Sequence, residues 1–181
     1  MPGPIFAVPA TGYLATVPSM TTRVLGPDDV TTYRSIRLEA LRSDPAAFCS
    51  THEREAAFDD ATFAERLAGY AGRPGVVIVD DAADPAGMVG IGEAEAGGAA
   101  MMWGMWVRPT ERRSGLGARL VEAAVAWADE AGLTAVDLWV VVGNGAAISL
   151  YERCGFLATG AADVVPGRPG VAEVEMRRKL R

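Results

Sequence analysis

An arginine- and glycine-rich turn between two regular segments offers the clearest chemistry in this sequence. The stretch RPTERRSGLGARL, residues 108–120, follows nine largely apolar residues and leads into a segment with helical spacing. Free N–H groups at a helix start attract anions. Gly115 and Gly117 let the backbone approach a ligand closely, and Arg112 and Arg113 add charges that can fork onto phosphate oxygens. The stretch is therefore suited to hold a pyrophosphate, whereas an ordinary connecting turn needs none of the arginines.

Two common phosphate-binding motifs do not fit this turn. A P-loop requires G-x-x-x-x-G-K-[ST], and the chain contains no such run. A dinucleotide fingerprint requires G-x-G-x-x-G at the first strand–helix unit, but the run GLGARL that begins at Gly115 lacks the third glycine. The pattern that fits is Arg-x-x-Gly-x-Gly, from Arg112 to Gly117.

A second pattern, NGAAISLYERCGF, runs from Asn144 to Phe156. It fits N-x-x-A-x-x-x-Y-x-x-x-G-F. Together the two patterns resemble the signatures of the GNAT superfamily of acetyl-CoA-dependent N-acetyltransferases. The early segment RLEALRSDPAAFCST is also similar to a subgroup of bacterial GNAT proteins, and the resemblance runs from about Thr21 to the C-terminus.

The resemblance implies that acetyl-CoA is the cofactor and that it binds in a V-shaped opening. One wall of the opening is the strand ending at Val107, and the other is the strand ending near Val142. A backbone N–H near Met105–Val107 would bond the thioester carbonyl and hold the oxyanion as it develops. The implied cofactor-binding residues are Trp106, Val107, Arg112, Arg113, Ser114, Gly115, Leu116, Gly117, Ala118, Asn144 and Tyr151.

In the implied reaction the amine attacks the thioester directly, so the enzyme needs no nucleophile of its own. An alkyl amine, with a pKa of about 10.4, must lose a proton, and the departing thiolate is helped by an acid. Tyr151 is the predicted acid, although it could also be a core aromatic residue. Asn144 could equally be a helix N-cap.

The general base is open at this stage. The strand Ala99–Val107 carries no acid, so Glu93 and Glu95 on the preceding strand are the nearest choices. A water held by backbone carbonyls would also serve, and Glu39 could reach the acceptor side. We take Glu93 as the candidate catalytic base.

Elements that position these residues follow from periodicity and breakers. Strands are predicted at 21–25, 75–79, 88–96, 99–107, 135–142, 156–161 and 171–178, and helices within 29–45, 59–72, 115–131 and 144–155. In the last strand Val174 and Met176 face one way, and Glu173 and Glu175 the other. The order predicts an α/β (α+β) fold, and the resemblance implies a mixed, mostly antiparallel sheet of about six to seven strands with helices on both faces.

Composition and breakers outline the organisation of the chain. Residues 1–20 have no period and many breakers, which predicts a flexible extension, followed by one GNAT domain over 21–181. No apolar run is long enough to span a bilayer. Two cysteines and one histidine give no metal spacing. We expect a cytoplasmic protein without a bound metal, either a monomer or a homodimer.

Charge narrows the class of partner. The net charge of −6 argues against nucleic acid and anionic membranes as partners. Residues 43–65 hold six acids against one arginine, which predicts a cationic acceptor, either a small-molecule amine or a peptide amino group. The alternative to an N-acetyltransferase is a non-catalytic module of the same fold that binds CoA as a sensor or partner domain.

Overall fold

A single sheet runs through the molecule. The computed structural model describes residues 21–70, 72–94 and 97–181, and among them the main strands follow the order β1-β3-β4-β5-β6-β8-β7, with β2 paired to β3. All neighbours are antiparallel except β5 and β6, which confirms the predicted mixed sheet. The strands are β1 (Thr22–Val24), β2 (Gly69–Tyr70), β3 (Arg73–Asp80), β4 (Gly87–Glu93), β5 (Ala99–Val107), β6 (Ala135–Val141), β7 (Leu157–Val164) and β8 (Ala172–Lys179).

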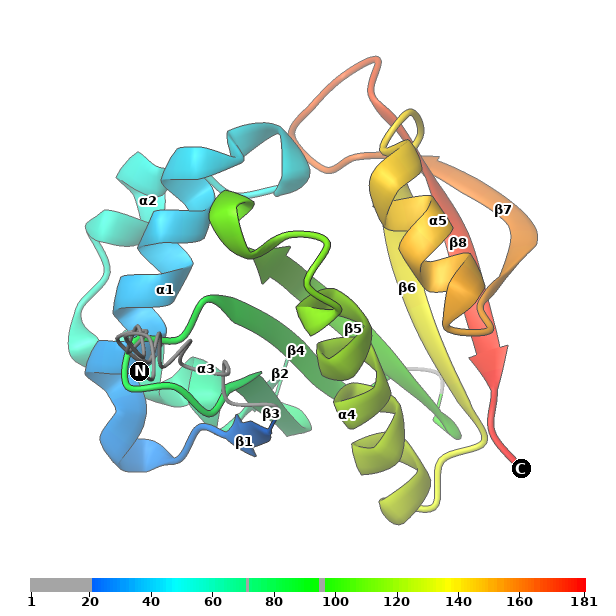
Figure 1. Cartoon of the computed structure of the whole chain (residues 1–181). Helices are drawn as coiled ribbons and strands as arrows, with labels where there is room; N and C mark the ends of the chain where they lie inside the picture. Colours follow the sequence, from blue (N-terminus) through cyan, green and yellow to red (C-terminus); the bar gives the residue numbers. More distant parts are fainter. Residues whose placement is uncertain (1–20, 71, 95–96) are drawn as a thin grey trace, which may run out of the picture.

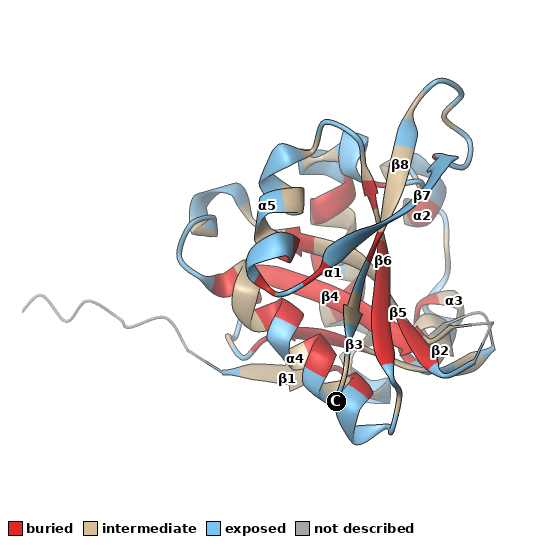
Figure 2. Ribbon diagram, turned by 90° about the vertical axis from the view of Figure 1, so that its right-hand side faces the viewer, coloured by how far each residue is buried: buried red, intermediate tan, exposed pale blue. Residues whose placement is uncertain are grey.

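Helices cover both faces of the sheet (Figure 1). The helices are α1 (Val30–Ser43), α2 (His52–Ala56), α3 (Asp60–Leu67), α4 (Leu116–Glu130) and α5 (Gly145–Arg153), with short 3-10 turns η1 (Pro27–Asp29), η2 (Pro45–Ala47) and η3 (Pro109–Glu111). Side chains alternate along a strand. Val89 and Ile91 of β4 therefore join the core under α4 and α5, whereas Met88 joins the core under α1 and α3. Figure 2 shows the central strands buried between these layers and β7 exposed at the edge.

The second predicted helix is shorter than its periodicity suggested. It ends at Leu67, and Gly69 and Tyr70 pair with β3 instead of continuing to Gly72. Its N-cap is Asp59, whose carboxylate accepts the Thr62 amide at 2.9 Å. The short helix α2 was not predicted, because five residues give too little periodicity to detect.

Strands β5 and β6 part from each other, and this creates the opening. They pair only from Ala99↔Ala135 to Met102↔Leu138, although β5 continues to Val107 and β6 to Val141. Figure 1 shows the two strands close together at one end and diverging toward the other. The predicted V-shaped opening therefore has a direct cause in the register.

The predicted N-terminal extension, residues 1–20, lies outside the described residues. None of the helices that the structure does describe is long and apolar enough to cross a membrane.

Candidate active site

A β-bulge lies on β5 at the open end of the two strands. Met88 of β4 pairs with Trp106 and Gly90 pairs with Trp103, so Val89 alone faces two residues of β5, Gly104 and Met105. The backbone at Gly104 has a φ of 61°, which suits glycine. A bulge leaves a backbone group outside the ladder. On the opposite side of β5, the pairing with β6 among the described residues ends at Met102. The edge of β5 that faces the opening therefore has no strand partner beside the bulge, where the predicted contact to a thioester carbonyl requires a free backbone group.

The loop before α4 presents backbone amides. Gly115 is the N-cap of α4 in the left-handed conformation, with a φ of 87°, and Arg113 has a φ of 65°. A positive φ is unfavourable for a residue with a side chain, so the backbone at Arg113 is strained. The amides of the first turn of a helix have no partner within the helix, and no acidic side chain lies in that turn of α4. The local charge therefore favours an anion.

The two glycines of the loop serve different purposes. Gly115 provides the left-handed turn, whereas Gly117 allows close packing. A Cβ added to Gly117 would lie 3.1 Å from Leu150 Cδ2 of α5 and 3.4 Å from Met105 Cε of β5. Gly117 thus brings the start of α4 close to both walls of the opening.

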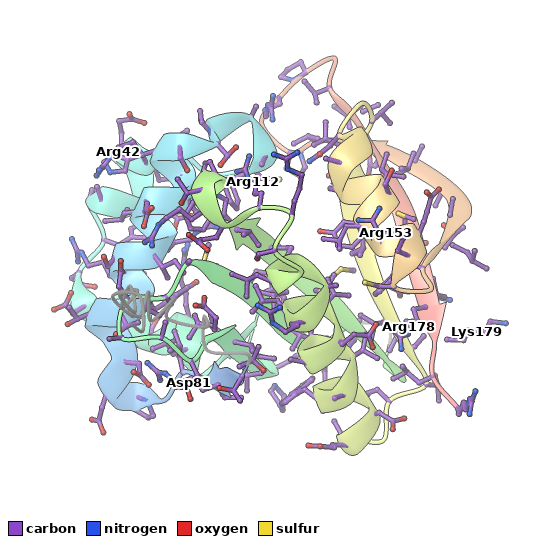
Figure 3. The ribbon with its side chains drawn as sticks, in the orientation of Figure 1. Arg42, Asp81, Arg112, Arg153, Arg178 and Lys179 are labelled. Carbon is purple, nitrogen blue, oxygen red and sulfur yellow. The ribbon has the colours of Figure 1, made fainter. Side chains whose placement is uncertain are left out.

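Two of the four arginines in residues 108–120 form ion pairs with acids of α1 or just after it. Arg108 forms two hydrogen bonds of 2.7 Å with Glu39 of α1. Arg112 donates to the Val107 carbonyl at 3.0 Å and forms an ion pair with Asp44, the residue after α1. Figure 3 shows Arg112 between the end of α1 and the start of α5. In this conformation Arg112 braces the loop against α1, so the predicted phosphate contact would require its side chain to leave Asp44.

The other two arginines remain near the loop. Arg113 is exposed and, within the described part of the chain, has no hydrogen-bonded or ion-paired partner. Arg119, one turn into α4, approaches the Ser114 carbonyl with Nη1 at 3.5 Å, and its buried Nε atom has no partner among the described residues. Sequence reasoning missed Arg119. Its place one turn after Gly115 was the available signal, since residues four apart share a helix face.

On the other wall, Asn144 and Tyr151 belong to helix α5. The Asn144 side chain accepts the Ala147 amide at 3.2 Å and caps the helix. Tyr151 is buried, with its ring 5.9 Å from that of Phe156. Burial raises the pKa of the Tyr151 phenol, and the nearby Cys154 thiol raises it further. Tyr151 is therefore protonated at neutral pH, as an acid must be.

A cavity of about 550 Å³ lies between η2 and the junction of β6 with α5. Its lining includes Asp44, Val141, Asn144 and Arg168. The Asp44 carboxylate also accepts the indole N–H of Trp106 at 2.8 Å. Trp106 is only 4% exposed, so its backbone, not its ring, is what a ligand in the opening can meet.

Glu93 does not lie with the other predicted site residues. It pairs with Ala100, at the end of β5 that is still bonded to β6. At about 3.3 Å per residue, this position is roughly 13 Å along the strand from the bulge at Gly104. Glu95 lies outside the described residues, and Glu39 is held by Arg108.

Arginines neutralise much of the acid-rich stretch 43–65. Glu55 is 1% exposed and is bonded to Arg37 at 2.8 Å and to Arg66 at 2.9 Å. Arg37 also lies over the Phe48 ring, and its Nη1 atom is 3.6 Å from a Cβ placed on Gly104. This network of Glu55, Arg37 and Arg66 therefore reaches the bulge on the face of the sheet that α1 and α3 cover. The net charge of this region is the sum of the acids and the arginines, not of the acids alone.

The chain resembles known acetyltransferases in sequence. Residues 36–156 match the model of the acetyltransferase (GNAT) family. Because the match covers more than half of the chain, the chain belongs to the GNAT family, whose members use acetyl-CoA, and the predicted resemblance is confirmed. No curated protein sequence matches the chain.

Solved structures share the fold at low sequence identity. A ribosomal-protein-alanine N-acetyltransferase from Brucella melitensis has a TM-score of 0.72 and 19% identity over 89% of this chain and 100% of that one. A GNAT acetyltransferase from Streptococcus pneumoniae has a TM-score of 0.70 and 18% identity over 88% of this chain and 99% of that one. A protein from Salmonella typhimurium, solved with its cofactor acetyl-CoA, has a TM-score of 0.68 and 20% identity over 89% and 94%.

Proposed function

We propose that this acetyltransferase moves the acetyl group of acetyl-CoA to a primary amine by direct attack. The observation that supports this most strongly is the bulge at Gly104–Met105, which lies where β5 and β6 have parted and beside the amides that begin α4. The thioester of acetyl-CoA in the opening would meet a free backbone group of β5. The pyrophosphate of the same cofactor would meet the amides at the start of α4.

The residues of the loop fit an anionic cofactor. The cofactor contacts that we propose are the backbone of Trp106 and Val107, the loop and first turn of α4 (Arg113, Ser114, Gly115, Leu116, Gly117 and Ala118) and the wall residues Asn144 and Tyr151. Leu116 is buried, so it contributes through its backbone alone, and its amide, which here donates to Ser114 Oγ at 3.3 Å, must turn to the cofactor. We add the Arg119 side chain, and we propose that Arg112 contributes only after leaving Asp44.

Acetyl-CoA supplies an activated acyl group and a thiolate that leaves. Tyr151 donates its phenol proton to that thiolate, because it is a protonated group on the α5 wall of the opening. The backbone at the bulge stabilises the oxyanion. The chain therefore needs to provide orientation, an oxyanion contact and two proton transfers.

The acceptor that we propose is a cationic amine, either a small molecule or a peptide amino group. Among the structural neighbours, the Brucella melitensis protein is a ribosomal-protein-alanine N-acetyltransferase. Asp44 supports a cationic acceptor, because its carboxylate lines the cavity and becomes free for another cation when Arg112 leaves it for the cofactor. We retain the cytoplasm as the proposed location.

A panel of amines tests this function. The protein is incubated with acetyl-CoA and with cationic, neutral or acidic primary amines, and CoA release is matched to amide product by mass spectrometry. We expect cationic amines to turn over best, with an apparent KM that rises with salt. Binding of acetyl-CoA without turnover of any amine would favour the non-catalytic CoA-binding module instead. Equal turnover of neutral, acidic and cationic amines would remove the proposed charge preference.

A further inference from the structure

The acids nearest the cofactor opening are already bonded to arginines. Glu39 is held by Arg108, and Glu55 is buried between Arg37 and Arg66. Asp44 lines the cavity, but hydrogen bonds from Trp106 and Arg112 outweigh the effect of burial and lower its pKa. A carboxylate held ionised in this way is a poor base for an ammonium group.

Glu173 of β8 is the strand partner of a residue that lines the same cavity. It pairs with Val141, the last residue of β6, and Val141 lines the cavity. Val141 is three residues beyond Leu138, and Met105 is three residues beyond the Leu138 partner Met102. Counted along the strands from that last pair, Glu173 and the bulge lie equally far toward the open end, with β6 between them.

The side chain of Glu173 points to the acceptor face of the sheet. Val174 and Met176 pack into the core under α4 and α5, so alternation sends Glu173 to the opposite face. Cys49, in the segment after η2, provides independent support. Burial raises the pKa of the Cys49 thiol, and the charge of Glu173 raises it further, so the two groups lie near each other on that face.

Glu173 is also free to exchange a proton. Within the described part of the chain it has no hydrogen-bonded or ion-paired side-chain partner, and it is only partly exposed. Burial raises its pKa, and so does Asp163, which faces it from β7. The other ionisable groups around this position are the Cys49 thiol and the Arg37 and Arg168 guanidinium groups that act on it.

We infer that Glu173 is the general base of the reaction and takes the proton of the acceptor ammonium through one water molecule. This inference rests on the proposed function. The amine nitrogen forms a bond to the acetyl carbon as the carbon–sulfur bond breaks. One proton passes from nitrogen through water to the Glu173 carboxylate, and the thiolate takes its proton from Tyr151. The amide nitrogen loses its second proton to water, and the Glu173 carboxyl group and the Tyr151 phenolate then return to their resting states by exchanging protons with solvent.

The test compares Glu173→Gln with Glu175→Gln. Glu175 lies on the same face two residues along and accepts a hydrogen bond from Thr159 at 2.8 Å. With an alkyl amine that the wild-type protein acetylates, we expect Glu173→Gln to lower kcat/KM by about 100-fold. Glu175→Gln should stay within about twofold of wild type. Equal acetyl-CoA affinity and melting temperature in the three proteins show that folding is intact.

Two further measurements separate base catalysis from a structural role. Methoxyamine is already neutral at the assay pH, so its acetylation should fall far less in Glu173→Gln than that of the alkyl amine. Asp163→Asn removes the charge that raises the Glu173 pKa, so the acidic limb of the pH profile of kcat/KM should shift to lower pH.

Each outcome supports or overturns the inference. Full activity of Glu173→Gln with the alkyl amine, or an equal loss with both amines, would overturn the role of Glu173 but leave the proposed function standing. A wild-type protein that acetylates no amine would instead overturn the proposed function, and the role of Glu173 with it. If Glu173→Gln melts early, the shift of the pH limb in Asp163→Asn decides the question, and an unmoved limb contradicts the inference.

Discussion

The two sides of the opening are built in different ways. On the cofactor side, the bulge of β5, the loop and the start of α4 follow one another along the chain, from Gly104 to Ala118, and offer backbone groups. On the acceptor side, α1, η2, β6 and β8 meet from distant parts of the chain. Long-range ion pairs join that side together, such as Arg108 with Glu39 and Arg37 with Glu55.

This difference corresponds to two kinds of recognition, one by backbone groups and one by side chains. A pyrophosphate can be held by backbone amides, which depend on glycine positions and a helix start. An acceptor must be recognised by side chains, and here Glu39, Asp44 and Glu55 are already matched with arginines. The charge that an acceptor meets therefore depends on which of these pairs can open.

The largest effect that we expect concerns the ion pairs of the acceptor side. Replacing Glu55 by alanine leaves the Arg37 guanidinium largely buried without its partner. Breaking a buried pair in this way costs about 3–5 kcal/mol of unfolding free energy. Urea unfolding of Glu55→Ala measures the loss. Glu65→Ala, an exposed acid on the neighbouring helix α3, is the control and should change stability by less than about 0.5 kcal/mol.

The same pair predicts a pH dependence. Burial raises the pKa of Glu55, but hydrogen bonds and charge from Arg37 and Arg66 lower it more, so its folded pKa lies below its ordinary value. Its stabilisation is therefore present above the unfolded pKa of about 4.3 and is lost as the pH falls through the folded pKa. The stability difference between wild type and Glu55→Gln should shrink in acid. A constant difference down to acid unfolding would contradict this account.

On the opposite wall of the opening, in α5, Tyr151→Phe keeps the buried ring and removes only the hydroxyl group. Loss of a general acid lowers kcat by about 100-fold or more, while acetyl-CoA affinity should change much less. A thioester with a more acidic leaving thiol should partly restore the rate. If the variant keeps more than half of the wild-type kcat while chemistry limits the rate, Tyr151 serves packing alone.

Gly115→Ala tests whether the loop depends on a left-handed residue. An alanine with a positive φ costs about 1–2 kcal/mol, and we expect acetyl-CoA affinity to fall as the loop shifts. Gly145→Ala is a matched control at the start of α5, where an added Cβ meets nothing within 4 Å. Calorimetry and urea unfolding on both variants check the result. Equal behaviour of the two variants would mean that the turn at Gly115 tolerates a side chain.

Asn144→Ala gives the smallest effect and decides between the two roles considered for this residue. Loss of the N-cap hydrogen bond to Ala147 costs about 1 kcal/mol of stability. If Asn144 only caps α5, acetyl-CoA affinity should stay unchanged; a fall of tenfold, about 1.4 kcal/mol, would establish a cofactor contact as well. Asn144→Ser retains a capping oxygen and separates the two effects.

Sequence patterns predicted the cofactor side well because its parts are local. Prediction and structure agree within a residue or two for three elements: the strand 99–107, the helix that begins near Gly115 and the helix predicted to end at Gly155. The ion pair of Arg112 with Asp44 was not predictable, because it joins residues far apart in the chain. Glu173 shows the same limit. The alternation of side chains predicted which face of the last strand carries Glu173, but only the pairing of β8 with β6 shows that this position lies at the opening.

The most direct test of the account is to map acetyl-CoA on the protein by amide chemical shifts in solution. We expect the largest changes at the amides of residues 113–118 and of the bulge, residues 104–107, with smaller changes at the start of α5. The amides of β1 and β3, at the far edge of the sheet, should stay unchanged. Saturable shifts confined to another surface, or none at concentrations at which acetyl-CoA binds, would contradict the site described above.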